Sequence, residues 1–169
     1  MVRYFYLFVV VLILGSSCAD KFSLLREDNN SASLRLDGIY LSEDSLQIVD
    51  MYFFYENGIV LSRGSIQKDK LESKIHNLAI SQDEKYKSMK FLWGVYHIED
   101  DRIKFERWYP SDTPYEAYIK EGKILNDTTF QIDKSYRTNG KVRRNINEKY
   151  QFRKTSSKPD SLNRWIFDN

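Results

Sequence analysis

The sequence of 169 residues has little cysteine, histidine or net charge. It holds one cysteine and two histidines, and 26 Lys and Arg residues nearly balance 24 Asp and Glu residues. A lone cysteine excludes a disulfide framework and a thiolate metal site. Intrinsic disorder goes with low hydrophobicity and high net charge, whereas 15% of these residues are aromatic. We therefore expect one globular domain.

The sequence also lacks the common catalytic and cofactor motifs. It contains no HExxH, paired CxxC, Walker loop, Gly-x-Gly-x-x-Gly or Gly-x-Ser-x-Gly. The acids Glu99, Asp100 and Asp101 lie in an expected turn, where Asp is favoured for its backbone hydrogen bonds. His76 and His97 have polar surroundings and are expected at the surface. We expect no catalytic residue, metal site or cofactor, and an enzymatic function has no motif to support it.

The one long apolar run lies at the N-terminus. Tyr4 to Leu14 follow Arg3 without a polar break, and Gly15-Ser16-Ser17 come next. A basic start, a short apolar run and small residues are typical of a secretory signal, whereas a membrane-spanning helix needs about 20 apolar residues. Residues 1–17 are therefore interpreted as a signal peptide.

The residues Leu14-Gly15-Ser16-Ser17-Cys18 resemble the lipobox of bacterial lipoproteins, with Gly15 where that family usually has Leu. The resemblance implies cleavage before Cys18 and acylation of this cysteine. Two or more acyl chains attach a protein stably to a membrane. Ala19 and the single acid Asp20 favour the outer membrane, with the domain facing the periplasm. The alternative is an ordinary signal peptide with an incidental cysteine.

The remaining chain divides into a polar segment and a long series of predicted strands. Residues 18–36 are interpreted as the acylated cysteine and a flexible tether, and residues 37–169 as one domain. Eight segments rich in aromatic and β-branched residues alternate with turn pairs such as Asn57-Gly58. Eight antiparallel strands are enough to close a small barrel, so we predict a mainly β, up-and-down barrel. The predicted strands are 38–41, 51–56, 59–66, 91–99, 102–109, 115–125, 128–136 and 146–154.

Two stretches are expected to be helical. Leu71, Ile75 and Leu78 recur at helical spacing, which predicts one or two short helices within 68–88. An amphipathic stretch at 160–167, after Pro159, predicts a last short helix.

Strand pairing tests the barrel, because neighbours must agree about the buried face. A turn at Asp100-Asp101 pairs Tyr96 with Phe105, and Gly94 with Arg107, on the inward face. For the last hairpin we expect a long loop, 137–145, which pairs Phe130 with Phe152 and Ile132 with Tyr150.

The first predicted strand opens with Gly38-Ile39-Tyr40, which is similar to the Gly-x-Trp of the lipocalin-like barrels. That resemblance implies that an Arg of the last strand, Arg153, packs over the ring of Tyr40. The chain as a whole, with Lys158-Pro159-Asp160-Ser161 near its end, is similar to small lipoproteins of the Bacteroidota.

Inward side chains make the barrel a candidate ligand-binding domain. A barrel of this size holds one small apolar or amphiphilic molecule, or is filled by its own side chains. An inward Arg107 favours a ligand with an anionic group, because a buried charge needs a partner. The predicted ligand-binding residues are Tyr96, Phe105, Arg107, Phe130 and Phe152.

A basic segment supports a different function. Residues 134–158 contain nine Lys or Arg and a single acid, Glu148. Such a segment is either a solvated hairpin or a contact surface for an anionic partner. In the second case the chain is a non-enzymatic interaction module with a filled core, which contacts an envelope protein or polysaccharide through this loop or through exposed Trp93 and Trp108. Nucleic acid is not an expected partner of an exported, nearly neutral chain. The predicted contact residues of the loop are Arg137, Lys141, Arg143 and Arg144.

Overall fold

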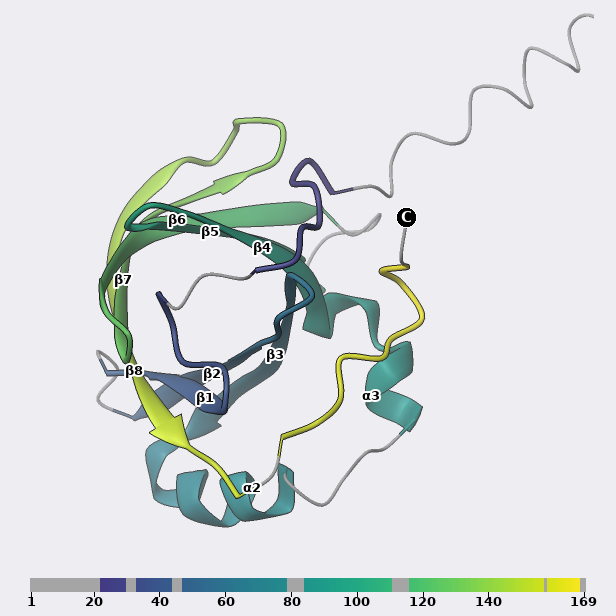
Figure 1. Cartoon of the computed structure of the whole chain (residues 1–169), viewed down its shortest axis with the longest axis vertical. Coiled ribbons are helices and arrows are strands. Elements are labelled where there is room, and N and C mark those ends of the chain that lie inside the picture. Colours follow the sequence, from purple (N-terminus) through teal and green to yellow (C-terminus); the bar gives the residue numbers. More distant parts are fainter. Residues whose placement is uncertain are drawn as a thin grey trace, which may run out of the picture.

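The computed structural model describes residues 22–29, 33–43, 47–78, 84–110, 116–156 and 158–167. This part of the chain forms a closed barrel of eight antiparallel strands in sequential order (Figure 1). The predicted fold class is therefore confirmed. Cys18 and the interpreted signal peptide lie outside the described residues. The strands are β1 (Gly38–Ser42), β2 (Ile48–Phe54), β3 (Ile59–Gln67), β4 (Trp93–Glu99), β5 (Arg102–Trp108), β6 (Ala117–Asn126), β7 (Thr129–Arg137) and β8 (Arg144–Lys154).

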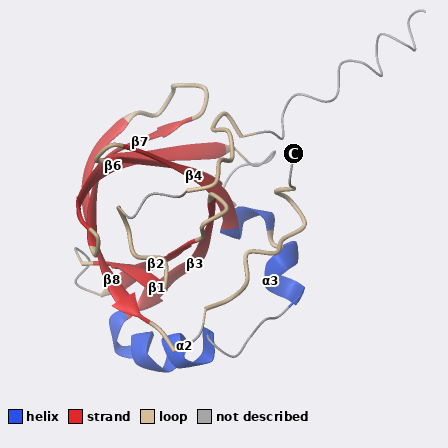
Figure 2. Cartoon of the chain, viewed as in Figure 1, coloured by secondary structure: helices blue, strands red, loops and turns tan. Residues whose placement is uncertain are grey.

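The predicted helical insertion joins β3 to β4 outside the barrel wall (Figure 2). It consists of the 3₁₀ turn η1 (Lys68–Lys70), the helices α2 (Leu71–Leu78) and α3 (Glu84–Ser88), and the 3₁₀ turn η2 (Lys90–Leu92). Of the helices within the described ranges, none has the length and apolar character to cross a membrane.

The predicted C-terminal helix is wrong, because residues 158–167 form an irregular strap (Figure 2). The side-chain oxygen of Asn163 accepts hydrogen bonds from the backbone N–H groups of Trp165 and Ile166, at 2.9 and 2.7 Å. The backbone of Arg164 bonds to the carbonyl of Lys87 in α3. These local bonds satisfy groups that a helix would otherwise pair.

The hairpin of β4 and β5 has the predicted register. Tyr96 pairs with Phe105 and Gly94 with Arg107. A Cβ atom on Gly94 would collide with the carbonyl oxygen of Glu106 and would lie 3.1 Å from Cβ of Arg107. Glycine is therefore needed for the close approach of the two strands.

The predicted register of the last hairpin is wrong by two residues. Phe130 pairs with Tyr150 rather than Phe152, and Ile132 pairs with Glu148. A shift of two keeps Phe130, Ile132 and Tyr150 on their predicted face, so alternation alone cannot detect it. Beyond the bulge between Ile132 and Lys134 the difference from the predicted register is three residues. Ring packing accounts for the observed register, because Phe130 and Tyr150 stack with centroids 4.8 Å apart.

The implied contact between Arg153 and Tyr40 is also wrong. Tyr40 pairs with Phe152, so the next residue, Arg153, points to the opposite face of β8. There Arg153 donates two hydrogen bonds of 2.6 Å to the carboxylate of Glu72 in α2. The hydroxyl of Tyr40 instead donates to the backbone carbonyls of Arg35 and Asp127.

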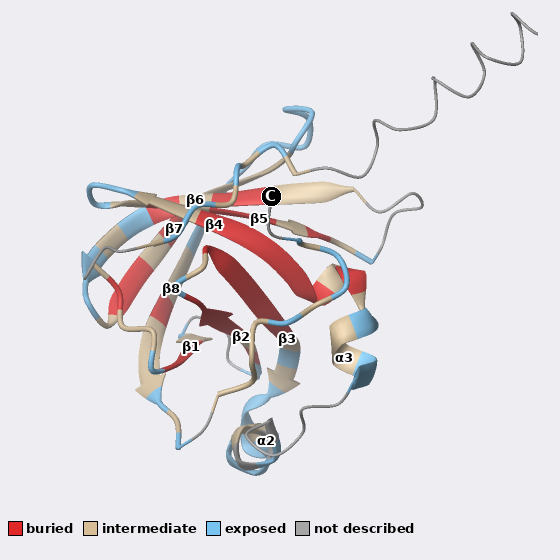
Figure 3. Cartoon of the chain, turned by 45° about the vertical axis from the view of Figure 1, so that its right-hand side comes forward, coloured by how far each residue is buried: buried red, intermediate tan, exposed pale blue. Residues whose placement is uncertain are grey.

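Two apolar clusters stabilise the barrel. One fills the interior, and the other lies on the outer face of β1 to β4 beneath the insertion and the C-terminal strap. The strands at this wall are buried along most of their length (Figure 3). Trp93 belongs to the outer cluster at 2% exposure, and Trp108 is 3% exposed, so the prediction that these two residues are exposed is wrong.

The N-terminal segment lies against the barrel where it is described, in contrast to the flexible tether that we expected. A carboxylate oxygen of buried Glu106 accepts hydrogen bonds from the backbone N–H groups of Ser23 and Leu24, at 2.7 and 2.8 Å. Further along, Leu34 is 4% exposed within the interior cluster. The segment thus covers one end of the barrel, which we call the plugged end, at the turns 55–58 and 126–128.

Candidate ligand-binding site

The predicted aromatic residues meet inside the barrel, but they fill its plugged half. Tyr96, Phe105 and Phe130 are at most 2% exposed and belong to one cluster, with Phe152 packed at its edge. Their rings pack around Phe54, at centroid distances of 5.0 to 5.9 Å for the first three. These aromatic residues therefore contribute mainly to the core.

The fifth predicted residue, Arg107, lies further along the same face of β5, towards the end where β5 stops at Trp108. We call this end of the barrel the basic end. The guanidinium of Arg107 donates a 2.7 Å hydrogen bond to the carbonyl of Phe91 and lies 4.4 Å from the ring centroid of Tyr109. Among the described residues, no carboxylate forms an ion pair with it. Its positive charge is therefore held by a carbonyl and by aromatic rings.

A second cation, Lys120, lies on the inward face of β6 directly opposite Phe105. Its ammonium forms an ion pair with the carboxylate of Glu148 and donates a 3.3 Å hydrogen bond to the hydroxyl of Tyr150. That hydroxyl in turn donates to Glu148 at 2.8 Å. The side chain of Lys120 is 8% exposed, whereas that of Glu148 is 32% exposed. The pair therefore reaches from the interior towards solvent.

Tyr52 lies between the two cations. The centroid of its ring is 5.9 Å both from the guanidinium carbon of Arg107 and from the ammonium of Lys120. Two positive groups therefore lie near one aromatic ring without sharing an acid. We define the basic cluster as Tyr52, Arg107, Tyr109, Lys120, Glu148 and Tyr150.

At neutral pH the two cations of the cluster are charged, and the hydroxyl groups of Tyr109 and Tyr150 are protonated. Burial opposes the charge of Lys120, but Tyr52, Tyr109 and Glu148 outweigh it and raise the pKa of the ammonium. Burial likewise opposes the charge of Arg107, and the neighbouring Tyr52 and Tyr109 raise its pKa. Burial raises the pKa of Tyr150 well above its ordinary value. The cluster thus offers positive charge and hydroxyl donors, which suit an anionic group.

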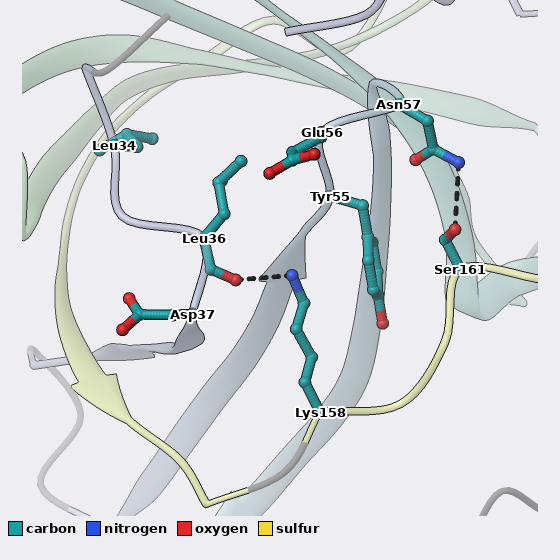
Figure 4. A pocket seen from close by; sticks show the side chains of 8 residues that line it. All are labelled: Leu34, Leu36, Asp37, Tyr55, Glu56, Asn57, Lys158 and Ser161. Carbon is teal, nitrogen blue, oxygen red and sulfur yellow. Dashed lines mark hydrogen bonds between the residues drawn. The ribbon is translucent and has the colours of Figure 1, made fainter. Parts of the chain in front are cut away.

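A separate pocket of about 670 Å³ opens at the plugged end (Figure 4). Its basic group, Lys158, extends between Leu36 and Tyr55 and donates to the carbonyls of Leu36 and Phe54, at 2.7 and 2.6 Å. Its ammonium also lies 4.1 Å from the ring centroid of Tyr55. Lys158 therefore fastens the C-terminal strap to the barrel, and the pocket has a weaker case as a ligand site.

The predicted contact residues of the basic loop are only partly free. Arg137 ends β7 and is held by an ion pair with Glu116 and a 2.8 Å hydrogen bond to the hydroxyl of Tyr118. Arg144 belongs to β8 rather than to the loop. Lys141, Arg143 and Arg144 are exposed and form a small basic surface.

Sequence reasoning identified Arg107 but missed Lys120, Glu148 and the tyrosines around them. The signal for Lys120 was the alternation of Tyr118, Lys120, Gly122 and Ile124, which places the lysine on the same strand face as Ile124. No comparable signal marks Glu148, because its partner Lys120 comes from a strand that is not its neighbour.

The chain matches no protein-family model, no curated protein and no solved structure. Among the residues that the structure describes, no group of three or more His, Cys, Asp or Glu is placed to hold a metal ion. The basic cluster is therefore the candidate site on the strength of its own geometry.

Proposed function

We propose that this chain is a membrane-attached barrel protein that binds an amphiphilic molecule by its anionic group. In this proposal Cys18 is acylated, and the barrel lies in the cell envelope at the outer membrane, facing the periplasm. The basic cluster holds the anionic group, and the apolar part of the ligand lies along the neighbouring aromatic side chains. The protein acts as a carrier or receptor rather than as an enzyme.

One observation carries the ligand proposal. Arg107 and Lys120 both face the barrel interior, and Glu148 is the one acid that a described ion pair places against them. Removing a cation from water without an opposite charge is costly, so an excess of positive charge inside a protein is typical of an anion site. A carboxylate, sulfate or phosphate ester that accepts hydrogen bonds from both cations satisfies this excess.

Native mass spectrometry of the protein purified from bacterial envelopes tests this proposal. We expect extra mass on the folded protein that is lost on denaturation and that chemical analysis identifies as an anionic amphiphile. The double variant Arg107→Gln and Lys120→Gln should retain the barrel by circular dichroism but lose most of the bound mass. The matched control, Lys141→Gln with Arg143→Gln, removes two exposed charges and should bind as before. A bare polypeptide mass, persisting after incubation with envelope lipids, would refute ligand binding.

Attachment is tested separately. Metabolic labelling with radioactive palmitate should mark the wild-type chain but not the Cys18→Ala variant, because no other thiol is present. Fractionation of the envelope should place the wild-type chain with the outer membrane, and protease should reach it only after that membrane is opened. An unlabelled wild-type chain would contradict acylation.

The second candidate function is a non-enzymatic interaction module that contacts an envelope protein or polysaccharide. The exposed Lys141, Arg143 and Arg144 favour it, whereas Trp93 and Trp108 no longer do, because both are buried. Charge reversal at Arg143 and Arg144 distinguishes the two functions. It should abolish capture of a macromolecular partner but leave a ligand inside the barrel bound.

A further inference from the structure

An aromatic and basic surface forms where the described N-terminal segment meets the C-terminal strap. The ring of Phe22 packs on Trp108, with centroids 3.8 Å apart. The ammonium of Lys90 lies 4.6 Å from the ring centroid of Trp108 and 5.4 Å from that of Trp165. These contacts bring the N-terminal segment, η2 and the strap together, and Figure 1 shows the start of the purple segment near the yellow C-terminal end.

The strap presents large rings to solvent at this surface. Trp165 is 40% exposed, and Phe167, two residues later, is 70% exposed. The indole N–H of Trp165 donates a 3.0 Å hydrogen bond to the carbonyl of Ser88, which fixes its orientation. Of the seven large apolar residues that are exposed in the described ranges, four lie in the two segments 22–29 and 158–167. Exposed Trp and Phe on a fixed backbone are typical of surfaces that contact the headgroup region of a membrane.

Basic residues surround these rings. Helix α3 contributes Lys85 and Lys87, η2 contributes Lys90, and the strap contributes Arg164. Two described acids form ion pairs with this group. Asp160 pairs with Lys87, and Glu84 pairs with both Lys87 and Arg164. Arg164, whose side chain is 64% exposed, places a guanidinium beside the exposed rings, where it can reach the phosphates of lipid headgroups.

The short segment between Cys18 and Phe22 indicates that the partner of this surface is a lipid bilayer. Only three residues separate Cys18 from Phe22, and a chain of this length spans about 14 Å at most. An acyl group on Cys18 would thus hold Phe22 within that distance of the bilayer. We propose that the surface of Phe22, Trp165 and Phe167, called the membrane-facing surface below, lies on a phospholipid bilayer. This inference rests on the proposed acylation.

The orientation has a consequence for the barrel. Trp108 directly follows Arg107 at the end of β5, so the basic end is the end of the barrel that lies near the membrane. An amphiphile that leaves the bilayer then meets the basic cluster before the filled half of the interior.

Photo-crosslinking in the full chain tests this surface. The lipoprotein carrying Phe167→p-benzoyl-L-phenylalanine is reconstituted into vesicles of phosphatidylethanolamine and phosphatidylglycerol and is irradiated. The matched control places the same probe at Leu125, which is 51% exposed and lies at the plugged end of β6. We expect phospholipid adducts from position 167 and at least fivefold fewer from position 125. Arg164→Glu should lower the adduct yield from position 167.

Each other outcome overturns the inference in a recognisable way. Equal adduct yields, or none at position 167 from protein that floats with the vesicles, refute the orientation but leave the anchor standing. Protein that fails to float refutes the acylation and with it the orientation. Ligand binding is not measured here, so an empty barrel in native mass spectrometry leaves this surface unaffected. Both probe positions are exposed, and circular dichroism confirms that each variant is folded.

Discussion

Lys158 links the stability of the fold to pH. Burial lowers the pKa of its ammonium from 10.5 to about 8, although the negative charges of Glu56 and Asp37 act to raise this pKa. Between these values the unfolded chain binds more protons than the folded one, so stability must rise with pH through this window. The folded state is at its greatest disadvantage below about pH 8, where it has to bury a charged amine.

The size of this effect follows from the two pKa values. Integrated from about pH 7 to about pH 9.5, the gain in the free energy of unfolding is about 2 kcal/mol. For a domain of this size that gain corresponds to a rise in Tm of about 4–8 °C. At this upper pH limit tyrosine, whose ordinary pKa is about 10, is still mostly protonated, and the ionisation that does occur affects the wild type and the variants alike.

Thermal unfolding followed by circular dichroism at the two pH values measures the gain. The Lys158→Met variant keeps an aliphatic stem against Tyr55 but cannot titrate, so its rise in Tm should disappear. The control Lys154→Met removes an exposed lysine of β8 and should retain the wild-type rise. If Lys158→Met shows the same pH dependence as the wild type, the assignment to Lys158 is refuted.

Three further variants test the packing of the barrel. Leu34→Ala should lower the free energy of unfolding by about 2–5 kcal/mol in urea titrations, because it leaves a cavity beneath the plug; a loss below 1 kcal/mol would contradict a packed plug. Gly122→Ala should prevent a native circular dichroism spectrum, because its Cβ would collide with the carbonyl of Gln131; a native Tm would contradict the observed pairing. Glu106→Ala should free the segment at Ser23 and speed proteolysis within 22–29 by roughly tenfold, since lost hydrogen bonds to charged groups cost about 1.5–3 kcal/mol; an unchanged cleavage rate would contradict the anchoring role of Glu106.

The strand order and most strand positions were predictable because their signals are local. The Asp100-Asp101 turn sets the register of its hairpin, and alternation on both sides agrees with it. The last hairpin was not predictable to the residue, because a bulge between Ile132 and Lys134 and a six-residue loop leave registers two apart with the same faces. The stacking of Phe130 on Tyr150 and the hydrogen bonds of Thr129 to Gln151 and of Gln131 to Asn147 accompany the observed register.

Features outside the barrel depend on contacts that no local pattern reveals. The sequence pattern places Trp108 on the outward face of a hairpin and so predicts that it is exposed. In the structure Phe22 and Lys90, from distant parts of the chain, cover it. The candidate site was half predictable for the same reason. Arg107 followed from the glycine opposite it, whereas the pairing of Lys120 with Glu148 exists only once the barrel has closed.

Closure by β1 and β8 also determines how the chain must fold. β1 is the first strand to be synthesised, and its partner in the pairing of Tyr40 with Phe152 is the last. Until β8 arrives, one edge of β1 stays unpaired and is open to association with other chains. Contacts between such distant parts of a sequence slow folding, because the intervening chain must first be ordered. Leu34 packs into an interior that is complete only after closure, so the plug cannot dock fully before β8 has paired with β1.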